Sequence, residues 1–209
     1  MTAPSARLLT PDRAFFEQDA VHLAPLLLGA VLGYAAPDGE VAIRISEVEA
    51  YRGVGEDPGS HAFRGRTPRN SVMFAEPGHL YAYFSYGMHV CLNVVAGPVG
   101  HASAVLLRGA TVVHGVELAR ARRPGVVDRD LARGPARLSR ALGVPLDADG
   151  ADLLAVPFEL QVAASPSHFA SGPRTGVSGD GGGAAYPWRF WSPGDEGVSP
   201  YRRHKLAAE

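Results

Sequence analysis

The stretch VAIRISEVEAY at residues 41–51 constrains the fold more than any other part of the chain. At the two-residue period of a β-strand, one face carries three apolar side chains, then two glutamates and a tyrosine: Val41, Ile43, Ile45, Glu47, Glu49 and Tyr51. A carboxylate is costly to bury unless it is paired or used in chemistry. The pattern therefore predicts a core strand that ends at a pocket. It also fits a face that turns to solvent after Ile45 and exposes both glutamates.

Length and hydrophobic content set the number of domains. A chain of 209 residues with 46% hydrophobic residues can fill one core, so we expect a single domain over residues 1–209. We expect frayed ends at residues 1–10 and 202–209. Residues 176–185 contain the run GDGGG, which is typical of a flexible loop.

Charge and cysteine content exclude several classes of protein. The net charge is −1, so any binding of nucleic acid has to come from a local basic patch. Cys91 is the only cysteine, and the sequence has no CxxC or HExxH spacing, so we expect no disulfide, no metal and no cofactor. The most apolar run, residues 23–36, contains Pro25 and is too short to span a bilayer. We therefore expect a soluble, cytoplasmic monomer with no membrane partner.

The remaining periodicity predicts an α+β fold, a single domain with a curved antiparallel β-sheet and peripheral helices. Hydrophobic runs and turn signals predict helices at 11–32 (with a break near Pro25), 112–123 and 134–143, and strands at 34–36, 80–85, 88–95, 102–107, 152–164 and 187–191. Residues 52–78 lack hydrophobic periodicity. They form a loop longer than compact domains usually carry without a function.

The second half of this loop has a local excess of positive charge. Residues 61–70 contain Arg64, Arg66 and Arg69 and no acid. Such a cationic strip in a neutral protein is suited to the phosphates of a DNA backbone. An ordinary solvated loop is the alternative interpretation.

A second excess of arginine lies further along the chain. Residues 117–140 hold seven arginines, Arg137 among them, against three acids. The expected helix start at Gly134 and Pro135 also offers free backbone N–H groups, which bind phosphate well. Solvated helix faces are again the alternative.

The dipeptide Tyr86-Gly87 lies at the tip of the expected hairpin, where an aromatic ring has little core to join. A tyrosine exposed at a rigid tip can act as a wedge or stacking group for nucleic acid. It can also be ordinary amphipathic surface.

Many of these stretches occur in one order: EVEAYRG at 47–53, SH at 60–61, GRTPRN at 65–70, MF at 73–74, PG at 77–78, YAYFSYGM at 81–88, CLN at 91–93, VLLR at 105–108, GP at 134–135 and PWRF at 187–190. Together they resemble the alkyladenine (3-methyladenine) DNA glycosylase family over roughly residues 20–200. The resemblance implies a monofunctional base-excision repair enzyme that acts on double-stranded DNA containing damaged purines. Such an enzyme rotates the damaged nucleotide out of the stack and hydrolyses its N-glycosidic bond.

The resemblance also implies roles for single side chains. Glu49 corresponds to the general base, which polarises the attacking water and offsets positive charge on the sugar. Tyr86 corresponds to the group that intercalates through the minor groove. The implied base pocket has three stacking rings, a side chain that crowds the exocyclic amino group of guanine, and an arginine at its edge: Tyr51, His61, Tyr83, Asn93 and Arg108. Glu47 receives no role, and pairing with an arginine is one possibility for it.

The register of the hairpin conflicts with this pocket. A two-residue turn at 86–87 would pair Tyr83 with Val90 and place Asn93 on the opposite sheet face from Tyr83. If both line one pocket, the loop must be odd in length or bulged. We therefore predict an irregular hairpin.

Two other functions fit parts of the sequence. A non-catalytic damaged-DNA-binding module would keep the loop arginines and Tyr86, although an intact Glu49 with Tyr51 disfavours it. A carbohydrate-active hydrolase could use Glu47 and Glu49, about 7 Å apart on one strand face, but would leave the arginines unexplained. The only lysine is Lys205, away from these motifs, so we expect hydrolysis to an intact abasic product rather than Schiff-base chemistry.

Overall fold

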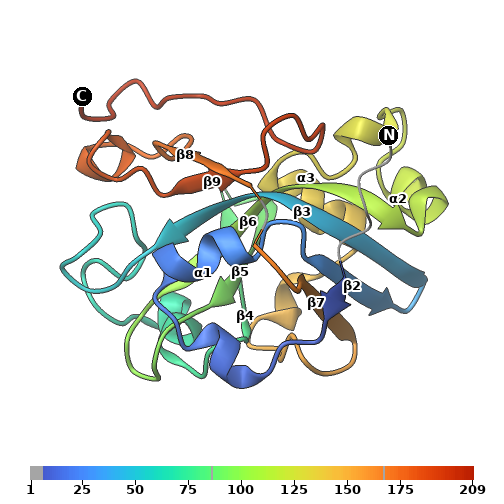
Figure 1. Ribbon diagram of the computed structural model, residues 1–209, viewed down its shortest axis with the longest axis horizontal. Helices are drawn as coiled ribbons and strands as arrows, with labels where there is room; N and C mark the ends of the chain where they lie inside the picture. Colours follow the sequence, from blue (N-terminus) through green and yellow to red (C-terminus); the bar gives the residue numbers. More distant parts are fainter. Residues whose placement is uncertain (1–6, 86, 167) are drawn as a thin grey trace.

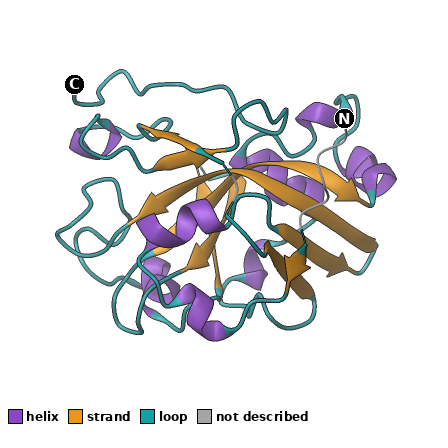
Figure 2. Ribbon diagram, viewed as in Figure 1, coloured by secondary structure: helices purple, strands orange, loops and turns teal. Residues whose placement is uncertain are grey.

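An antiparallel sheet forms the centre of the protein, and helices lie around its periphery (Figures 1 and 2). The computed structural model describes residues 7–85, 87–166 and 168–209, and the sheet within them has nine strands. The main path runs β1–β7–β2–β3–β6–β5–β4, while β9 pairs with β3 and β8 pairs with β9. The predicted α+β fold with an antiparallel sheet in a single domain is confirmed.

The strands are β1 (Leu8–Leu9), β2 (Val31–Ala36), β3 (Gly39–Tyr51), β4 (Leu80–Ser85), β5 (His89–Val95), β6 (Ala104–His114), β7 (Phe158–Ala163), β8 (Ala170–Gly172) and β9 (Arg189–Trp191). The α-helices are α1 (Ala20–Leu26), α2 (Val116–Arg122) and α3 (Pro135–Leu142). Short 3-10 helices are η1 (Arg13–Phe16), η2 (Pro68–Phe74), η3 (Asp128–Asp130), η4 (Leu146–Ala148) and η5 (Asp180–Gly182).

β3 is the central strand of the sheet. It pairs with β2 along its first half, with β9 along part of its second half, and with β6 along most of its length. The strand predicted at residues 41–51 is confirmed. It begins two residues earlier, where Gly39 closes the turn from β2 with φ +131°, a conformation that favours glycine.

One unpaired residue on β3 and one on β6 interrupt the ladder between these strands and change which residues of β3 face the core. Ser46 and Arg108 have no partner in the ladder between the two strands. The core residues of β3 are therefore odd-numbered up to Ile45 and even-numbered from Val48 onward. The single face predicted from the sequence, first apolar and then acidic, is wrong, because the two glutamates lie opposite the core face of the strand end. They are not exposed either, since both are fully buried.

The chain that follows β9 covers the face with the glutamates. β9 pairs with β3 between Glu47 and Glu49, and the C-terminal segment passes over β3 in Figure 1. Gly109 on β6 permits this close approach, because a Cβ there would lie 2.5 Å from the carbonyl oxygen of Gly197. The glutamates are thus enclosed between the sheet and a second layer of chain.

The main hydrophobic core combines residues of β2, β3, β5, β6 and β7 with residues of α1 and α3. α3 contributes Leu138, Ala141 and Leu142, whose spacing places them on one helix face. The helix predicted at residues 134–143 is confirmed. Its cap Gly143 adopts φ +77° at the C-terminus, as expected for a helix-ending glycine.

The helix predicted at residues 11–32 is shorter than expected. Its N-terminal part is η1, and α1 ends at Leu26, one residue after Pro25. Proline removes a backbone donor and clashes with the preceding turn, so the helix stops there. The leucines that follow are still buried, but in the turn and in β2, where Leu32 is paired with Ile43.

Two further element boundaries differ from the prediction. Residues 112–114 continue β6 rather than beginning a helix, and α2 starts only after Gly115, whose φ is +69°. The predicted strand at 152–164 is confirmed only from Phe158 onward, as β7.

Segments predicted to be loose make defined contacts. Leu8 and Leu9 pair with β7, although residues 1–6 lie outside the described range. The C-terminal tail runs beside the glycine-rich segment, where Gly179 N donates to Leu206 O at 2.8 Å. Gly182 allows this segment to fold tightly, because a Cβ there would lie 1.9 Å from Val177 O. The tail and residues 176–185 therefore form part of the layer that covers β3.

The hairpin of β4 and β5 resolves the predicted register conflict. Tyr83 pairs with Cys91 and Ser85 with His89, so three residues connect the strands. An odd loop places Tyr83 and Asn93 on the same sheet face, and the predicted irregular hairpin is confirmed. Tyr86 itself lies outside the described residues.

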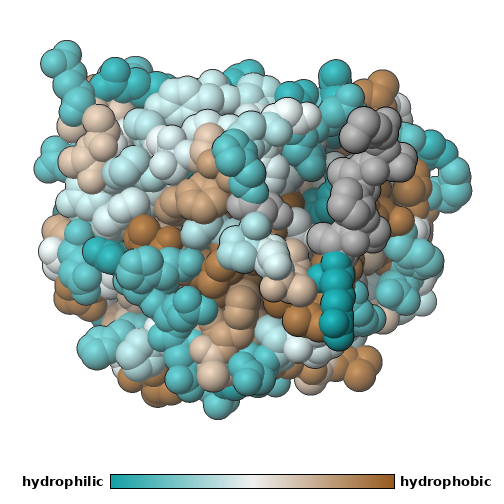
Figure 3. Space-filling view, in the orientation of Figure 1, coloured by the Kyte–Doolittle hydropathy of each residue, from teal (hydrophilic) through white to brown (hydrophobic). Residues whose placement is uncertain are grey.

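The face drawn in Figure 3 mixes hydrophilic and hydrophobic residues, with the hydrophobic ones in small groups. Among the described residues, no helix is both long and apolar enough to cross a membrane.

Candidate active site

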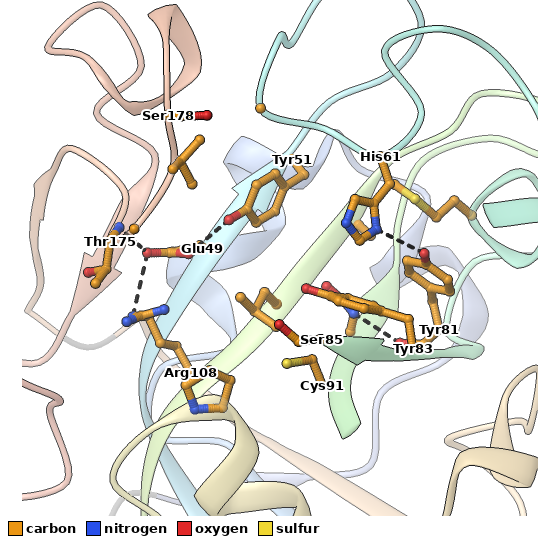
Figure 4. Close-up of a pocket in the computed structure, with 18 of the residues that line it drawn as sticks. Glu49, Tyr51, His61, Tyr81, Tyr83, Ser85, Cys91, Arg108, Thr175 and Ser178 are labelled. Carbon is orange, nitrogen blue, oxygen red and sulfur yellow. Dashed lines mark hydrogen bonds and ion pairs between the residues drawn. The ribbon is translucent and has the colours of Figure 1, made fainter. Parts of the chain in front are cut away.

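A cavity of about 660 Å³ opens between the end of β3, the hairpin and the C-terminal layer. Its walls include the general base and the five base-pocket residues that the family resemblance implies, which come from β3, β4, β5, β6 and the long loop: Glu49, Tyr51, His61, Tyr83, Asn93 and Arg108. In Figure 4, Glu49 and Tyr51 lie on one side of the cavity, and His61 and Tyr83 lie on the other.

Glu49 forms part of the cavity wall and is fully buried. Its Oε2 accepts a hydrogen bond from the Tyr51 hydroxyl at 2.9 Å, and its Oε1 accepts one from the Thr175 backbone N–H at 2.6 Å. Arg108 Nε lies 3.5 Å from Oε1 (Figure 4). A carboxylate offers about four lone-pair positions. Capacity therefore remains for one water molecule beside these donors.

Tyr51 supplies a hydroxyl donor as well as a ring. Burial, followed by the negative charge of Glu49, raises the pKa of Tyr51 well above its usual value, so the hydroxyl keeps its proton. The guanidinium of Arg174 lies 4.5 Å from the ring centre. The ring is thus held between the strand and a buried cation.

Aromatic rings form the opposite wall. The ring centres of His61 and Tyr83 are 4.5 Å apart at an angle of 75°, and His61 Nδ1 lies 3.0 Å from the Tyr81 hydroxyl. Partial desolvation, then the positive charge of Arg69, lowers the pKa of His61, so the imidazole is neutral at pH 7. Burial raises the pKa of Tyr81 to about 12. The wall is therefore uncharged and rich in π-electrons.

Asn93 and Arg108 complete the cavity floor and edge. Asn93 is buried, and its Nδ2 donates to Tyr81 O at 3.0 Å, which fixes the plane of the amide. Arg108 Nε donates to Glu47 Oε1 at 3.1 Å, so this guanidinium lies between both glutamates.

Glu47 accepts hydrogen bonds from two arginine side chains and a backbone N–H. Oε1 accepts from Arg189 Nε at 2.6 Å as well as from Arg108, and Oε2 accepts from Ser199 N at 2.7 Å. The pairing with an arginine considered from the sequence is confirmed. Glu47 does not line the cavity, so it is poorly placed to serve as the second carboxylate of a carbohydrate-active hydrolase.

None of the four predicted DNA-backbone arginines lines the cavity. Arg64 is exposed, and Arg66 lies over the ring of Phe74. Arg69 donates to Phe84 O at 2.9 Å and so connects the long loop to the hairpin. Arg137 is exposed near the start of α3, which reaches the cavity at its first residue.

Sequence reasoning missed Tyr81, Arg174 and Thr175. Tyr81 lies two residues before Tyr83, so the strand period could have placed it on the same face. Thr175 acts through its backbone, and its Oγ1 is buried without a hydrogen-bond partner among the described residues. The only signal for Arg174 is the density of glycines after it, which indicates close packing of backbone.

Comparison with known proteins identifies this arrangement. The family model for methylpurine-DNA glycosylase matches residues 14–196. The chain belongs to the methylpurine-DNA glycosylase family. This confirms the family resemblance predicted from the motifs, and it makes the protein a DNA glycosylase of the repair type, with DNA as its substrate.

Relatives of this glycosylase extend over nearly the whole chain. A protein of Leifsonia xyli is 60% identical over 202 residues, which cover 94% of this chain and 95% of the relative. A protein of Streptomyces avermitilis is 52% identical over 210 residues, which cover 98% and 96%. Both carry the name "Putative 3-methyladenine DNA glycosylase".

Proposed function

We propose that this glycosylase excises alkylated purines such as 3-methyladenine, and related lesions such as hypoxanthine, from duplex DNA. In this proposal it hydrolyses the N-glycosidic bond with a water molecule activated by Glu49. One observation carries the proposal: a buried carboxylate and three rings line the same cavity, where a flipped nucleotide would present its sugar and its base together.

The cavity suits an extruded purine. Its volume of about 660 Å³ is within the range of small-molecule sites in proteins. Tyr51, His61 and Tyr83 offer uncharged rings, and an alkylated purine that carries positive charge stacks favourably on π-electrons. Recognition by stacking depends on the electron deficiency of the base, so it requires no specific hydrogen bonds to the edge of the purine.

The chemistry follows from the position of Glu49. As the C1′–N bond breaks, its electron pair leaves with the purine, and the sugar gains oxocarbenium character. The water oxygen attacks C1′ while Glu49 accepts the water proton, and the carboxylate also offsets the positive charge on the sugar. A cationic lesion becomes neutral as it leaves, so it needs no strong general acid, whereas a neutral lesion such as hypoxanthine has to gain a proton at the purine as the C1′–N bond breaks. The product is an abasic site.

The burial of Glu49 sets a requirement on this step. Both carboxylate oxygens already accept short hydrogen bonds, and the side chain has no exposure to solvent. Lone-pair positions of the carboxylate remain free beside these donors, so the attacking water can bind there, but it has to enter from the cavity because bulk solvent does not reach the side chain. Catalytic hydrogen bonds commonly rearrange between the free enzyme and the substrate complex.

The surroundings of the cavity supply the contacts with DNA. Arg64, Arg66, Arg69 and Arg137 would bind backbone phosphates on either side of the flipped nucleotide. Tyr86, outside the described residues, would fill the gap left in the stack, because its place in the sequence is between β4 and β5.

Base release from a defined duplex tests the proposal. We expect wild-type protein to release free hypoxanthine from a single lesion in an oligonucleotide and free 3-methyladenine from alkylated duplex DNA, and to leave the strand uncleaved. A matched undamaged duplex should release no base. If the protein binds the lesion duplex but releases no purine, the proposed activity is wrong and a damaged-DNA-binding module is the better interpretation.

A further inference from the structure

Arg174 has the largest fully buried side chain among the described residues. Nη1 and Nη2 each donate to one oxygen of Asp57 at 2.6 Å, and Nη1 also donates to Ala50 O at 3.0 Å. Nε and Nη2 donate to Gly181 O at 3.0 and 2.7 Å. These five contacts match the five N–H groups of a guanidinium. Apolar residues of similar volume often stabilise a core as well as a buried ion pair does, so stability alone is a weak explanation for this pair.

The acceptors of Arg174 come from three segments around the cavity. Ala50 lies on β3 directly before Tyr51. Asp57 belongs to the long loop, where it also accepts two backbone N–H groups of its own turn, at 3.0 and 2.9 Å. Gly181 belongs to the glycine-rich segment of the covering layer. One planar cation therefore fixes the strand end, the loop and the cover relative to one another.

The donors to Glu49 both depend on this cation. Thr175 N, which donates to Glu49 Oε1 at 2.6 Å, belongs to the peptide group that directly follows Arg174. Tyr51, which donates to Oε2 at 2.9 Å, has the Arg174 guanidinium 4.5 Å from its ring centre. The two shortest hydrogen bonds to the carboxylate are thus held in place by a single side chain and its ion-pair partner.

We propose that Arg174, together with Asp57, is a positioning residue for base release: it places the Thr175 N–H and the Tyr51 hydroxyl, and through them it orients the Glu49 carboxylate. The inference rests on the proposed function and adds to it the group that holds the general base in position. Because shifts of about 1 Å near a reacting centre can lower a rate by roughly 100-fold, loss of this ion pair affects the rate more than lesion binding.

Arg174→Lys tests this assignment. Lysine keeps the positive charge, but its compact ammonium cannot bridge Asp57, Ala50 and Gly181 at once. We expect the single-turnover rate of base release to fall by about 10- to 100-fold, with the Kd for a lesion duplex within about threefold of wild type. Asp57→Asn, which keeps the shape of the side chain, should act in the same direction and serves if the lysine variant does not fold.

A readout independent of catalysis is the proton resonance of the Thr175 amide. A short hydrogen bond to a carboxylate shifts an amide proton downfield, so the resonance should lie downfield in wild type and move upfield in both variants. Leu23→Ala is the matched control, because Leu23 is buried in the main core and does not line the cavity. It should lower stability but keep the base-release rate and the resonance.

The outcomes separate the inference from the proposed function. A wild-type rate or an unchanged Thr175 resonance in Arg174→Lys and Asp57→Asn overturns the inference, while base release by wild type still supports the function. An equal loss of rate in Leu23→Ala also overturns it, since general destabilisation would then explain the effect. If wild type releases no purine, the proposed function fails, and with it the assignment of Arg174 to base release.

Discussion

Tyr51→Phe isolates the hydroxyl that holds the general base. The substitution keeps the ring beside Arg174 and removes the donor that lies 2.9 Å from Glu49 Oε2. A hydrogen bond to a charged group contributes about 1.5–3 kcal/mol. If that loss appears fully in the barrier, the rate falls by about 10- to 160-fold, because each 1.36 kcal/mol corresponds to a factor of ten. Thr175 N at 2.6 Å remains as the second donor, so activity is reduced and not abolished.

The assay is single-turnover base release from a duplex with one hypoxanthine, with binding of the same duplex measured in parallel. Tyr83→Phe is the matched control, because its ring lies in the same cavity and its hydroxyl makes no hydrogen bond to Glu49. We expect base release to be slow in Tyr51→Phe and close to the wild-type rate in Tyr83→Phe. The Kd for the lesion duplex should be similar for all three proteins. Equal rates in the two variants would refute the role of the hydroxyl.

Three further predictions concern the surroundings of Glu49. Glu47→Gln leaves two buried guanidiniums, Arg108 and Arg189, with one carboxylate fewer, and should lower the free energy of unfolding by about 3–5 kcal/mol in urea titrations; a wild-type midpoint would contradict this. Arg64→Ala should lower the slope of log Kd against log salt concentration by about 1 and leave the rate of base release from the enzyme–DNA complex unchanged. An unchanged slope would show that Arg64 does not contact the DNA. Folding lowers the pKa of His61 from its ordinary value of 6.5, so the stability gained from the neutral ring is present above pH 6.5 and is lost as the pH falls below it. Unfolding curves of His61→Gln should lack this dependence, whereas the same slope in the variant would exclude His61 as its source.

The strand with Glu49 and Tyr51 can be predicted because its pattern is local. Apolar and polar residues alternate on each side of Ser46, which identifies a strand, and Glu49 and Tyr51 share a face whatever the strand pairs with. The irregular hairpin can also be predicted, since Tyr83 and Asn93 line one pocket only if the connection is odd in length. The strand inference needs no knowledge of distant residues, whereas the hairpin inference takes the shared pocket from the family resemblance.

The rest of the site depends on contacts that no local pattern shows. The change of core face at Ser46 requires a matching unpaired residue, Arg108, about sixty positions away. The donor from Thr175 is a backbone group, which carries no signature in the sequence. Residues 176–185 and the C-terminal tail resemble flexible segments because their glycines and charges bury little apolar surface. In the structure they stabilise one another through backbone hydrogen bonds.

The central claim is that Glu49 performs the chemistry and is not required for recognition. Glu49→Gln keeps the size of the side chain and removes its negative charge, so single-turnover release of hypoxanthine should fall by about 100- to 10,000-fold while the Kd for the lesion duplex stays within about threefold of wild type. A rate of base release within about threefold of wild type in Glu49→Gln would contradict the account.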